Sequence, residues 1–187
     1  MKSPLSPPFL SLAFALGVLA QPLQAAEFVV DPAKSAILVD VKATGHDFTA
    51  KLTKYKIKIT GDANSATPKT VDLSWDFKNL PTGDVKRDDE MLKWLEHAAM
   101  PSGSFNLSGF ATAKDGSTWA KGTLRIHGVR KIIQFPVTTV RDGSNLQVSG
   151  TVRIDHQDFK LGKIRKLLVL TVNPIVTIRF NLKGSIR

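Results

Sequence analysis

The stretch that decides the fold is Val71-Asp72-Leu73-Ser74-Trp75-Asp76-Phe77. Apolar residues occupy every second position in it, and polar residues occupy the positions between them. Successive side chains of a β-strand point to opposite faces, so this period of two predicts a strand with one buried and one solvated face. The same alternation recurs along most of the chain after Ala36, which predicts an all-β fold.

Similar alternating segments follow one another and predict about eight strands. Besides the stretch above, they span residues 36–42, 47–60, 119–126, 133–139, 146–154, 166–172 and 176–182, and a further one begins at residue 105. We expect the last two to join near Asn173-Pro174. Asp142-Gly143 is typical of a tight β-hairpin turn, and short turns of this kind favour antiparallel strands.

The segment over residues 47–60 changes phase. Its apolar residues stand at even positions up to Leu52 and at odd positions from Tyr55 onward. A one-residue slip would turn every side chain to the wrong face, so we expect a β-bulge or a sharp bend at Thr53-Lys54. Such a bend allows a sheet to curl around a closed core.

Residues 85–99 break the strand pattern. They hold an acidic run at residues 88–90 and then apolar residues at helical spacing, namely Met91, Leu92, Trp94 and Leu95. Acidic residues in a first turn suit the helix dipole, so we expect one short helix with its apolar side on the sheet, ended by Pro101. The prediction is an all-β domain, an eight-stranded antiparallel barrel with one short helix, because closure removes the exposed edges of a long sheet. A two-sheet sandwich is the alternative.

The first residues resemble an export signal. Lys2 is followed by an apolar run over residues 9–20 and then by the small residues Ala25-Ala26. The run is shorter than the roughly 20 residues that a membrane-spanning helix needs. We expect a cleaved signal peptide over residues 1–25, one domain over residues 26–187, and a periplasmic location. The chain has no cysteine, so this domain depends on its hydrophobic core without disulfides.

The charge balance is strongly basic. The formal net charge is +10 at pH 7, and +9 once Lys2 is removed with the predicted signal. An anionic membrane surface, an acidic partner and simple solvation each fit this charge, whereas export argues against nucleic acid. The basic run within residues 160–166 is equally compatible with membrane contact at one end of the barrel and with a solvated loop.

The sequence carries no motif of a known catalytic class. Its four histidines, at positions 46, 97, 127 and 156, lack zinc-ligand spacing, and it has no G-x-S-x-G segment and no glycine-rich phosphate loop. We therefore predict no catalytic residue, no metal site and no enzymatic activity. An enzyme would instead require His46 or His127 beside a carboxylate at the mouth of a pocket.

Arg87 has two interpretations. It can brace the junction between the preceding loop and the helix through a carboxylate such as Asp84 or Asp88, or it can meet the polar end of a ligand. The first is favoured, because an Arg–carboxylate pair at such a junction fixes its geometry. The acidic residues 88–90 are interpreted as solvated charges at the start of the helix and not as an acid–base pair.

Several short motifs occur along the chain in a particular order. They are Asp31-Pro32-Ala33-Lys34-Ser35, Thr44-Gly45-His46, Arg87-Asp88 followed by Met91-Leu92, Pro101 before Phe105, Gly122 to Arg130-Lys131, and Asp158-Phe159. With these motifs the chain resembles the periplasmic polyisoprenoid-binding, lipocalin-like (YceI-like) family over residues 27–186. Arg125 and the basic Lys163-Ile164-Arg165-Lys166 depart from the family pattern, which leaves the head group of the ligand open.

The resemblance implies a lipocalin-like barrel whose apolar tunnel binds a polyisoprenoid, an isoprenoid quinone or a fatty acyl lipid, with no covalent cofactor. Periodicity alone does not distinguish a tunnel from a filled core, because an eight-stranded barrel can be either. We expect His46 and Arg87 at a polar mouth. The predicted tunnel lining is Val41, Phe48, Leu52, Trp75, Leu92, Trp94, Phe105, Leu107, Phe135, Val137, Val148 and Phe180.

The sequence thus favours a periplasmic carrier that holds an apolar lipid or quinone in the barrel interior. The alternative is a solid-core basic adaptor for an acidic partner or an anionic membrane surface, which predicts salt-sensitive binding and no continuous cavity. Peripheral membrane contact and a homodimer both stay open.

Overall fold

The computed structural model describes residues 25–62, 68–162, 165–166 and 170–187. The predicted signal peptide, apart from Ala25, and part of the basic run after Gly162 lie outside the described residues. The described strands are β1 (Ala25–Val30), β2 (Ala36–Ala43), β3 (Phe48–Lys51), β4 (Lys56–Asp62), β5 (Pro68–Asp76), β6 (Ser102–Thr112), β7 (Thr118–Ile126), β8 (Val129–Asp142), β9 (Asn145–Asp155), β10 (Arg165–Lys166) and β11 (Leu170–Ile186).

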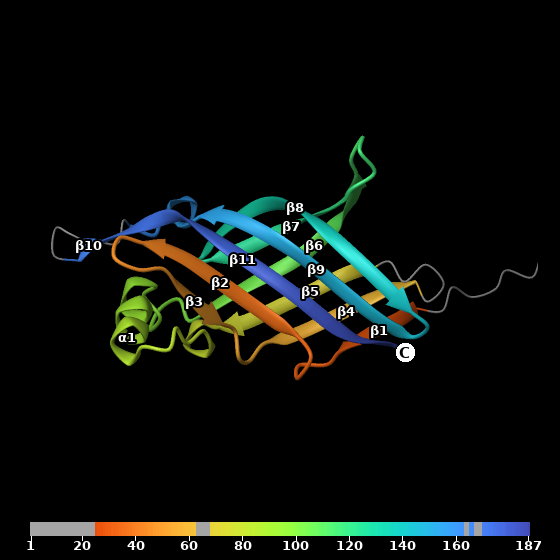
Figure 1. The fold of residues 1–187 in the computed structure, drawn as a ribbon, viewed down its shortest axis with the longest axis horizontal. Coiled ribbons are helices and arrows are strands. Elements are labelled where there is room, and N and C mark those ends of the chain that lie inside the picture. The colour runs from red at the N-terminus through yellow and green to blue at the C-terminus, as the bar shows by residue number, and fades with distance from the viewer. Residues whose placement is uncertain (1–24, 63–67, 163–164, 167–169) are drawn as a thin grey trace, which may run out of the picture.

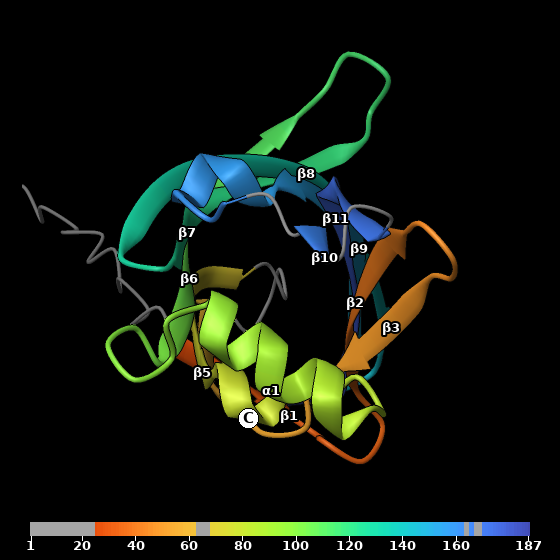
Figure 2. The same cartoon turned by 90° about the vertical axis from the view of Figure 1, so that its left-hand side faces the viewer.

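These strands close into a barrel, seen from the side in Figure 1 and from one end in Figure 2. The hydrogen-bonded order β1-β4-β5-β6-β7-β8-β9-β11 returns to β1, which pairs with the end of β11. β2 pairs with the preceding part of β11, and β3 pairs with β2, so β1 with β2 and β3 with β4 each occupy the place of one strand. The predicted eight-stranded antiparallel barrel is therefore confirmed.

The predicted break in the second segment lies between β3 and β4. β3 ends at Lys51 and β4 begins at Lys56. In the gap, the backbone N–H and the hydroxyl of Thr53 both donate to the carbonyl of Asn79, which replaces the interrupted ladder. Ala50 and Leu52 before the break and Ile59 after it are all buried, so the change of phase keeps apolar side chains inside.

Two strand predictions need correction. β1 was not expected, because Ala25–Val30 shows no clear alternation. The two strands expected at the C-terminus are one strand, β11, in which Asn173-Pro174 form an irregularity in the pairing with β2. Pro174 has no N–H for the ladder, and Asn173 Oδ1 accepts from the N–H of Ile175 at 2.8 Å, so the strand continues past the proline.

The predicted helix is α1 (Val85–Trp94), and it lies across one end of the barrel (Figure 2). Asp84 caps it by accepting from the N–H of Arg87 at 3.0 Å. The helix ends seven residues before Pro101, so a turn and not the proline terminates it, and Glu96 in that turn has a positive φ of 50°. Single 3-10 turns, η1 (Phe77–Asn79) and η2 (His156–Phe159), lie near the same end.

The opposite end of the barrel, termed the filled end, lies near the C-terminus in Figure 1. Phe28, Ile59 and Leu146 form a buried cluster there, backed by half-buried apolar residues. At the seam between β1 and β11, a Cβ at Gly184 would lie 2.1 Å from the carbonyl oxygen of Val29, so the two backbones approach as closely as glycine allows. This end is therefore packed with apolar side chains.

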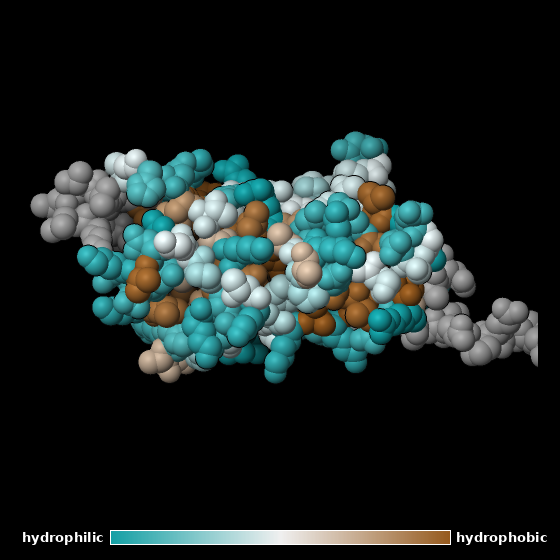
Figure 3. Space-filling model, turned by 60° about the horizontal axis from the view of Figure 1, so that its bottom comes forward, coloured by the Kyte–Doolittle hydropathy of each residue, from teal (hydrophilic) through white to brown (hydrophobic). Residues whose placement is uncertain are grey.

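The outer surface is mainly hydrophilic on the face in Figure 3, with apolar residues scattered among polar ones. The large apolar side chains that are exposed include Val85 on α1 and Ile132 and Val140 on β8. Among the described residues, no helix is long and apolar enough to span a membrane.

Candidate functional site

A cavity of about 1020 Å³ occupies the barrel interior. Inward-facing residues of nearly every strand line it, and so does one face of α1. The predicted alternative of a solid core is therefore wrong, because the apolar inner face supplied by strand alternation surrounds a cavity.

The polar side chains that line the cavity all come from its helix end. Thr44 and His46 belong to the turn between β2 and β3, and His156 belongs to η2. The others belong to α1 and its cap, namely Asp84, Lys86, Arg87, Glu90 and Lys93. The remaining described lining residues are apolar, so the cavity has a polar mouth and an apolar body.

The predicted lining residues lie on this cavity with one exception. Leu92 packs against the core cluster that includes Phe77 and Phe159, and it does not line the cavity. The reason is helix geometry, since Met91, Trp94 and Leu95 are spaced three and four residues apart on one face and Leu92 falls beside it. His46 and Arg87 lie at the mouth as expected. That any of these residues contacts a ligand stays a prediction.

Arg87 braces the start of α1, but through a threonine and not a carboxylate. Its Nε donates to Thr82 Oγ1 at 2.8 Å, and an Nη donates to the Thr82 carbonyl at 3.0 Å. The Thr82 hydroxyl in turn donates to Asp88. The guanidinium also lies 4.3 Å from the centre of the Phe48 ring, a cation–π contact that joins α1 to β3. The helix and the β2–β3 hairpin are thus connected at the mouth.

On another side of the mouth, Trp94 meets His156. Their ring centres are 5.0 Å apart and their ring planes are nearly perpendicular. Trp94 Nε1 donates to the Gly162 carbonyl at 2.9 Å. His156 is 4% exposed, and no described group makes a hydrogen bond of good geometry to either ring nitrogen. Burial lowers the pKa of His156, opposed by the Leu161 backbone and the charge of Asp155. The sequence prediction omitted His156, although it continues the inward phase of Val152 and Ile154.

The enzyme alternative required a histidine–carboxylate pair at the mouth of a pocket. His127 Nε2 does lie 3.4 Å from Glu96 Oε2, and His127 Nδ1 lies 3.3 Å from the Phe159 carbonyl. Neither His127 nor Glu96 lines the cavity. Across the part of the chain that the structure describes, no group of three or more His, Asp or Glu side chains is arranged to hold a metal ion.

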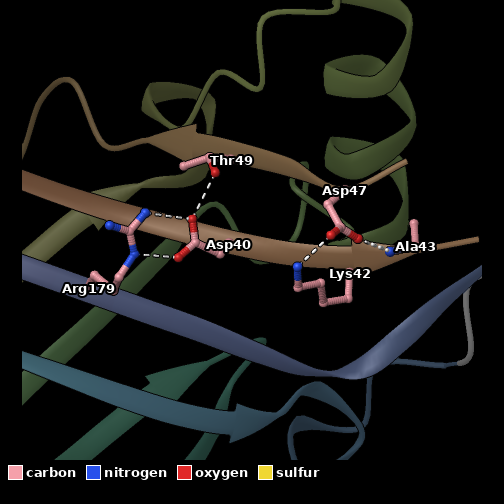
Figure 4. A network of polar contacts seen from close by, with 6 residues as sticks. All are labelled: Asp40, Lys42, Ala43, Asp47, Thr49 and Arg179. Carbon is pink, nitrogen blue, oxygen red and sulfur yellow. Dashed lines mark hydrogen bonds and ion pairs between the residues drawn. The ribbon is translucent and has the colours of Figure 1, made fainter. Parts of the chain in front are cut away.

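A polar network supports the β2–β3 hairpin from outside (Figure 4). Arg179 of β11 donates from Nε and Nη to Asp40 of β2, and the Thr49 hydroxyl of β3 donates to the same carboxylate at 2.7 Å. The Arg179 guanidinium lowers the pKa of Asp40 to about 2. Further along, Lys42 pairs with Asp47 in the turn. These contacts fix the part of the wall that carries Phe48 and His46.

The barrel, its end helix and the apolar interior agree with a sequence match to the YceI-like domain over residues 28–184. The chain belongs to the YceI-like domain family. The resemblance inferred from short motifs is thus confirmed. Among curated proteins, a UPF0312 protein of Shewanella denitrificans is 24% identical over 140 residues, which cover 72% of this chain and 73% of that protein.

Solved structures share the fold of this YceI-like domain. Burkholderia cenocepacia BcnA superposes with a TM-score of 0.72 at 22% identity, covering 84% of this chain and all of that one. A polyisoprenoid binding domain from Saccharophagus degradans, implicated in plant cell wall breakdown, has a TM-score of 0.67 at 19% identity and covers 87% and 99% of the two chains. At these identities the likeness concerns the fold.

Proposed function

We propose that this protein is a periplasmic carrier that holds the apolar chain of one lipid, a polyisoprenoid, isoprenoid quinone or fatty acyl lipid, inside the barrel without altering it chemically. The observation that carries the proposal is the cavity of about 1020 Å³ with an apolar body and a single polar end. The polyisoprenoid-binding relative in Saccharophagus degradans supports the same class of ligand.

The energetics of burial favour such a ligand. Transfer of one methylene from water to an apolar site contributes about 0.8 kcal/mol, so ten methylenes contribute roughly 8 kcal/mol. Part of this gain offsets the loss of translational and rotational freedom, so micromolar binding, which needs about 8 kcal/mol net, requires a chain of more than ten methylenes. A purely polar ligand would gain nothing from the apolar body of the cavity.

The polar mouth gives the ligand a direction. Its head group would lie near α1, where Lys86, Arg87 and His46 line the cavity, with its chain extending toward the cluster around Phe28. Arg87 is engaged with Thr82, so it would contact a head group only with the donors that this interaction leaves.

Native mass spectrometry of protein purified without detergent tests the proposal. We expect a bound lipid, and we expect the variant Val137→Phe, which fills the lumen from β8, to carry less of it. Val140→Phe is the matched control, because Val140 lies on the outer face of the same strand and is 56% exposed. A barrel that is consistently free of lipid and takes none up from vesicles would contradict the proposal.

Export to the periplasm is part of the proposal. Cleavage after Ala25 would leave Phe28–Val30 to pair with β11 as described. The intact mass of the protein recovered from a bacterial periplasmic fraction should match residues 26–187, and a chain that lacks residues 1–25 should remain in the cytoplasm. Recovery of the uncleaved chain in the cytoplasm would refute this location.

We further propose that the helix end contacts anionic membrane when lipid is exchanged. Val85 is 77% exposed at the start of α1 and is followed by Lys86, an apolar and basic pair suited to a lipid surface. Flotation with anionic vesicles should be weakened in Val85→Ser and at high salt. Equal flotation with neutral vesicles would count against this contact.

A further inference from the structure

Four aromatic rings line one side of the cavity: Trp75 of β5, Phe105 of β6, Phe135 of β8 and Phe180 of β11. The centre of the Phe135 ring lies 5.7 Å from that of Phe105 and 5.9 Å from that of Phe180. These three rings therefore contact one another in series, although β7 and β9 lie between their strands. No single strand could present such a continuous aromatic surface.

The strands beside the rings carry small residues at inward-facing positions. In the strand register, Gly103 is the partner of Trp75, Ala120 of Phe135 and Gly150 of Phe180. Gly122 of β7 lies under the ring of Phe105. Alternation of large and small inward residues is how small barrels fit their interiors. Here it places each ring over backbone that has little or no side chain.

The glycines are needed for space. A Cβ built on Gly103 would lie 2.3 Å from the Trp75 ring, one on Gly122 would lie 2.4 Å from the Phe105 ring, and one on Gly150 would lie 2.6 Å from the Phe180 ring. None of the three has a positive φ, so backbone conformation does not require glycine there. With any other residue, the ring would have to leave the wall, and the lumen is the free space beside it.

We propose that Gly103, Gly122 and Gly150 set the bore of the tunnel by letting the neighbouring rings lie on the wall, and so determine which cross-section of ligand chain the tunnel admits. This inference rests on the proposed function and names the residues that determine its selectivity. The rings held flat on the wall leave the space near the barrel axis to the ligand. Methyl branches widen a chain. When the bore narrows, the affinity for a branched chain therefore falls more than the affinity for a straight one.

Gly103→Ala is the cleanest variant, because the three nearest atoms to its Cβ all belong to the Trp75 side chain. At Gly122 and Gly150 a backbone carbonyl oxygen is also close. The experiment measures the dissociation constants of farnesol, which is methyl-branched, and dodecanol, a straight chain of the same backbone length. One added methyl group in a tight apolar site changes affinity by about tenfold or more. We expect Gly103→Ala to lower the preference for farnesol over dodecanol by about tenfold.

Two further variants separate selectivity from folding. Gly103→Ala with Trp75→Leu should restore the wild-type ratio of the two dissociation constants, because the smaller side chain returns the lost space. Ser104→Thr is the matched control, since it adds one methyl group to the outer face of the same strand and should leave the ratio unchanged. Trp75→Leu alone should shift the ratio toward farnesol, which tests the bore even where Gly103→Ala folds poorly.

The outcomes distinguish the two proposals. If both alcohols bind to folded Gly103→Ala and to Trp75→Leu with the wild-type ratio, the inference about the bore is wrong and the carrier proposal stands. If wild-type protein binds neither alcohol, both proposals are overturned.

Discussion

The two ends of the barrel are made by the same strands and differ in what covers them. At one end Phe28, Ile59 and Leu146 pack together and β1 closes the seam against β11. At the other end α1 and the β2–β3 hairpin lie at the mouth, and charged side chains line the cavity. The filled end is expected to supply stability, whereas the helix end is expected to control what enters the cavity.

The sharpest separation between the ends should come from two phenylalanines. Phe28→Ala at the filled end should lower the free energy of unfolding by about 3–5 kcal/mol, because it leaves a hole in a buried cluster. Phe48→Ala at the mouth should cost less stability, since Phe48 is half-buried, but it should weaken lipid retention by removing the ring under Arg87. Urea unfolding and lipid release measure the two effects. Equal losses of stability would erase the distinction between the ends.

Thr82→Val tests whether the helix end has its own local support. The substitution deprives Arg87 and Asp88 of the hydroxyl that joins them, so the free energy of unfolding should fall by about 1–3 kcal/mol. Release of a bound fluorescent fatty acid should also become faster, because α1 is less firmly fixed. Thr138→Val, at an exposed threonine on β8, is the control. Release at the wild-type rate would show that α1 does not limit exchange.

The helix end should also weaken in mild acid. Burial lowers the pKa of His156 below its ordinary value of 6.5, so the unfolded chain takes up this proton more readily than the folded one. The contribution of this group to the free energy of unfolding is complete above pH 6.5 and is lost as the pH falls through the lowered pKa. His156→Phe should flatten this part of the stability curve. An unchanged slope in His156→Phe would rule out this group as the cause.

The smallest effect is expected on the outer wall. Asp40→Asn breaks the ion pair with Arg179, and because these side chains are partly exposed the loss should be about 0–1 kcal/mol at neutral pH. Folding lowers the pKa of Asp40 from 3.8 to about 2. Its contribution to the free energy of unfolding is therefore present above pH 3.8 and disappears as the pH approaches 2. Thermal unfolding of the wild type and the variant should therefore converge in acid. A constant difference would mean that the substitution perturbs packing instead of charge.

The sequence predicted the strands well because alternation is a local property. It also predicted the break after Leu52, where the phase changes, and α1, where the spacing becomes helical. It missed β1, which lacks alternation, and it divided β11 at Pro174, because a proline within a strand is tolerated only where the pairing shifts. The hydrogen bond from the N–H of Ile175 to Asn173 Oδ1, which lets the strand continue, forms only in the folded strand and has no signal in the sequence.

The candidate site could be predicted only in part. Inward phase identified most of the cavity lining, and the helical face explains why Leu92 is the exception. Whether the interior is hollow depends on how rings lie over Gly103 and Gly150, which are contacts between strands. His156 could have been found, because it continues the inward phase of β9 beyond Ile154.

The most direct test of the difference between the two ends is a crystal structure of the protein purified without detergent. We expect a continuous chain of electron density along the barrel, with its polar end beside α1 and its apolar end toward Phe28. An interior that contains only ordered water, or a ligand with its polar group against Phe28, would contradict the assignment of the helix end as the polar mouth.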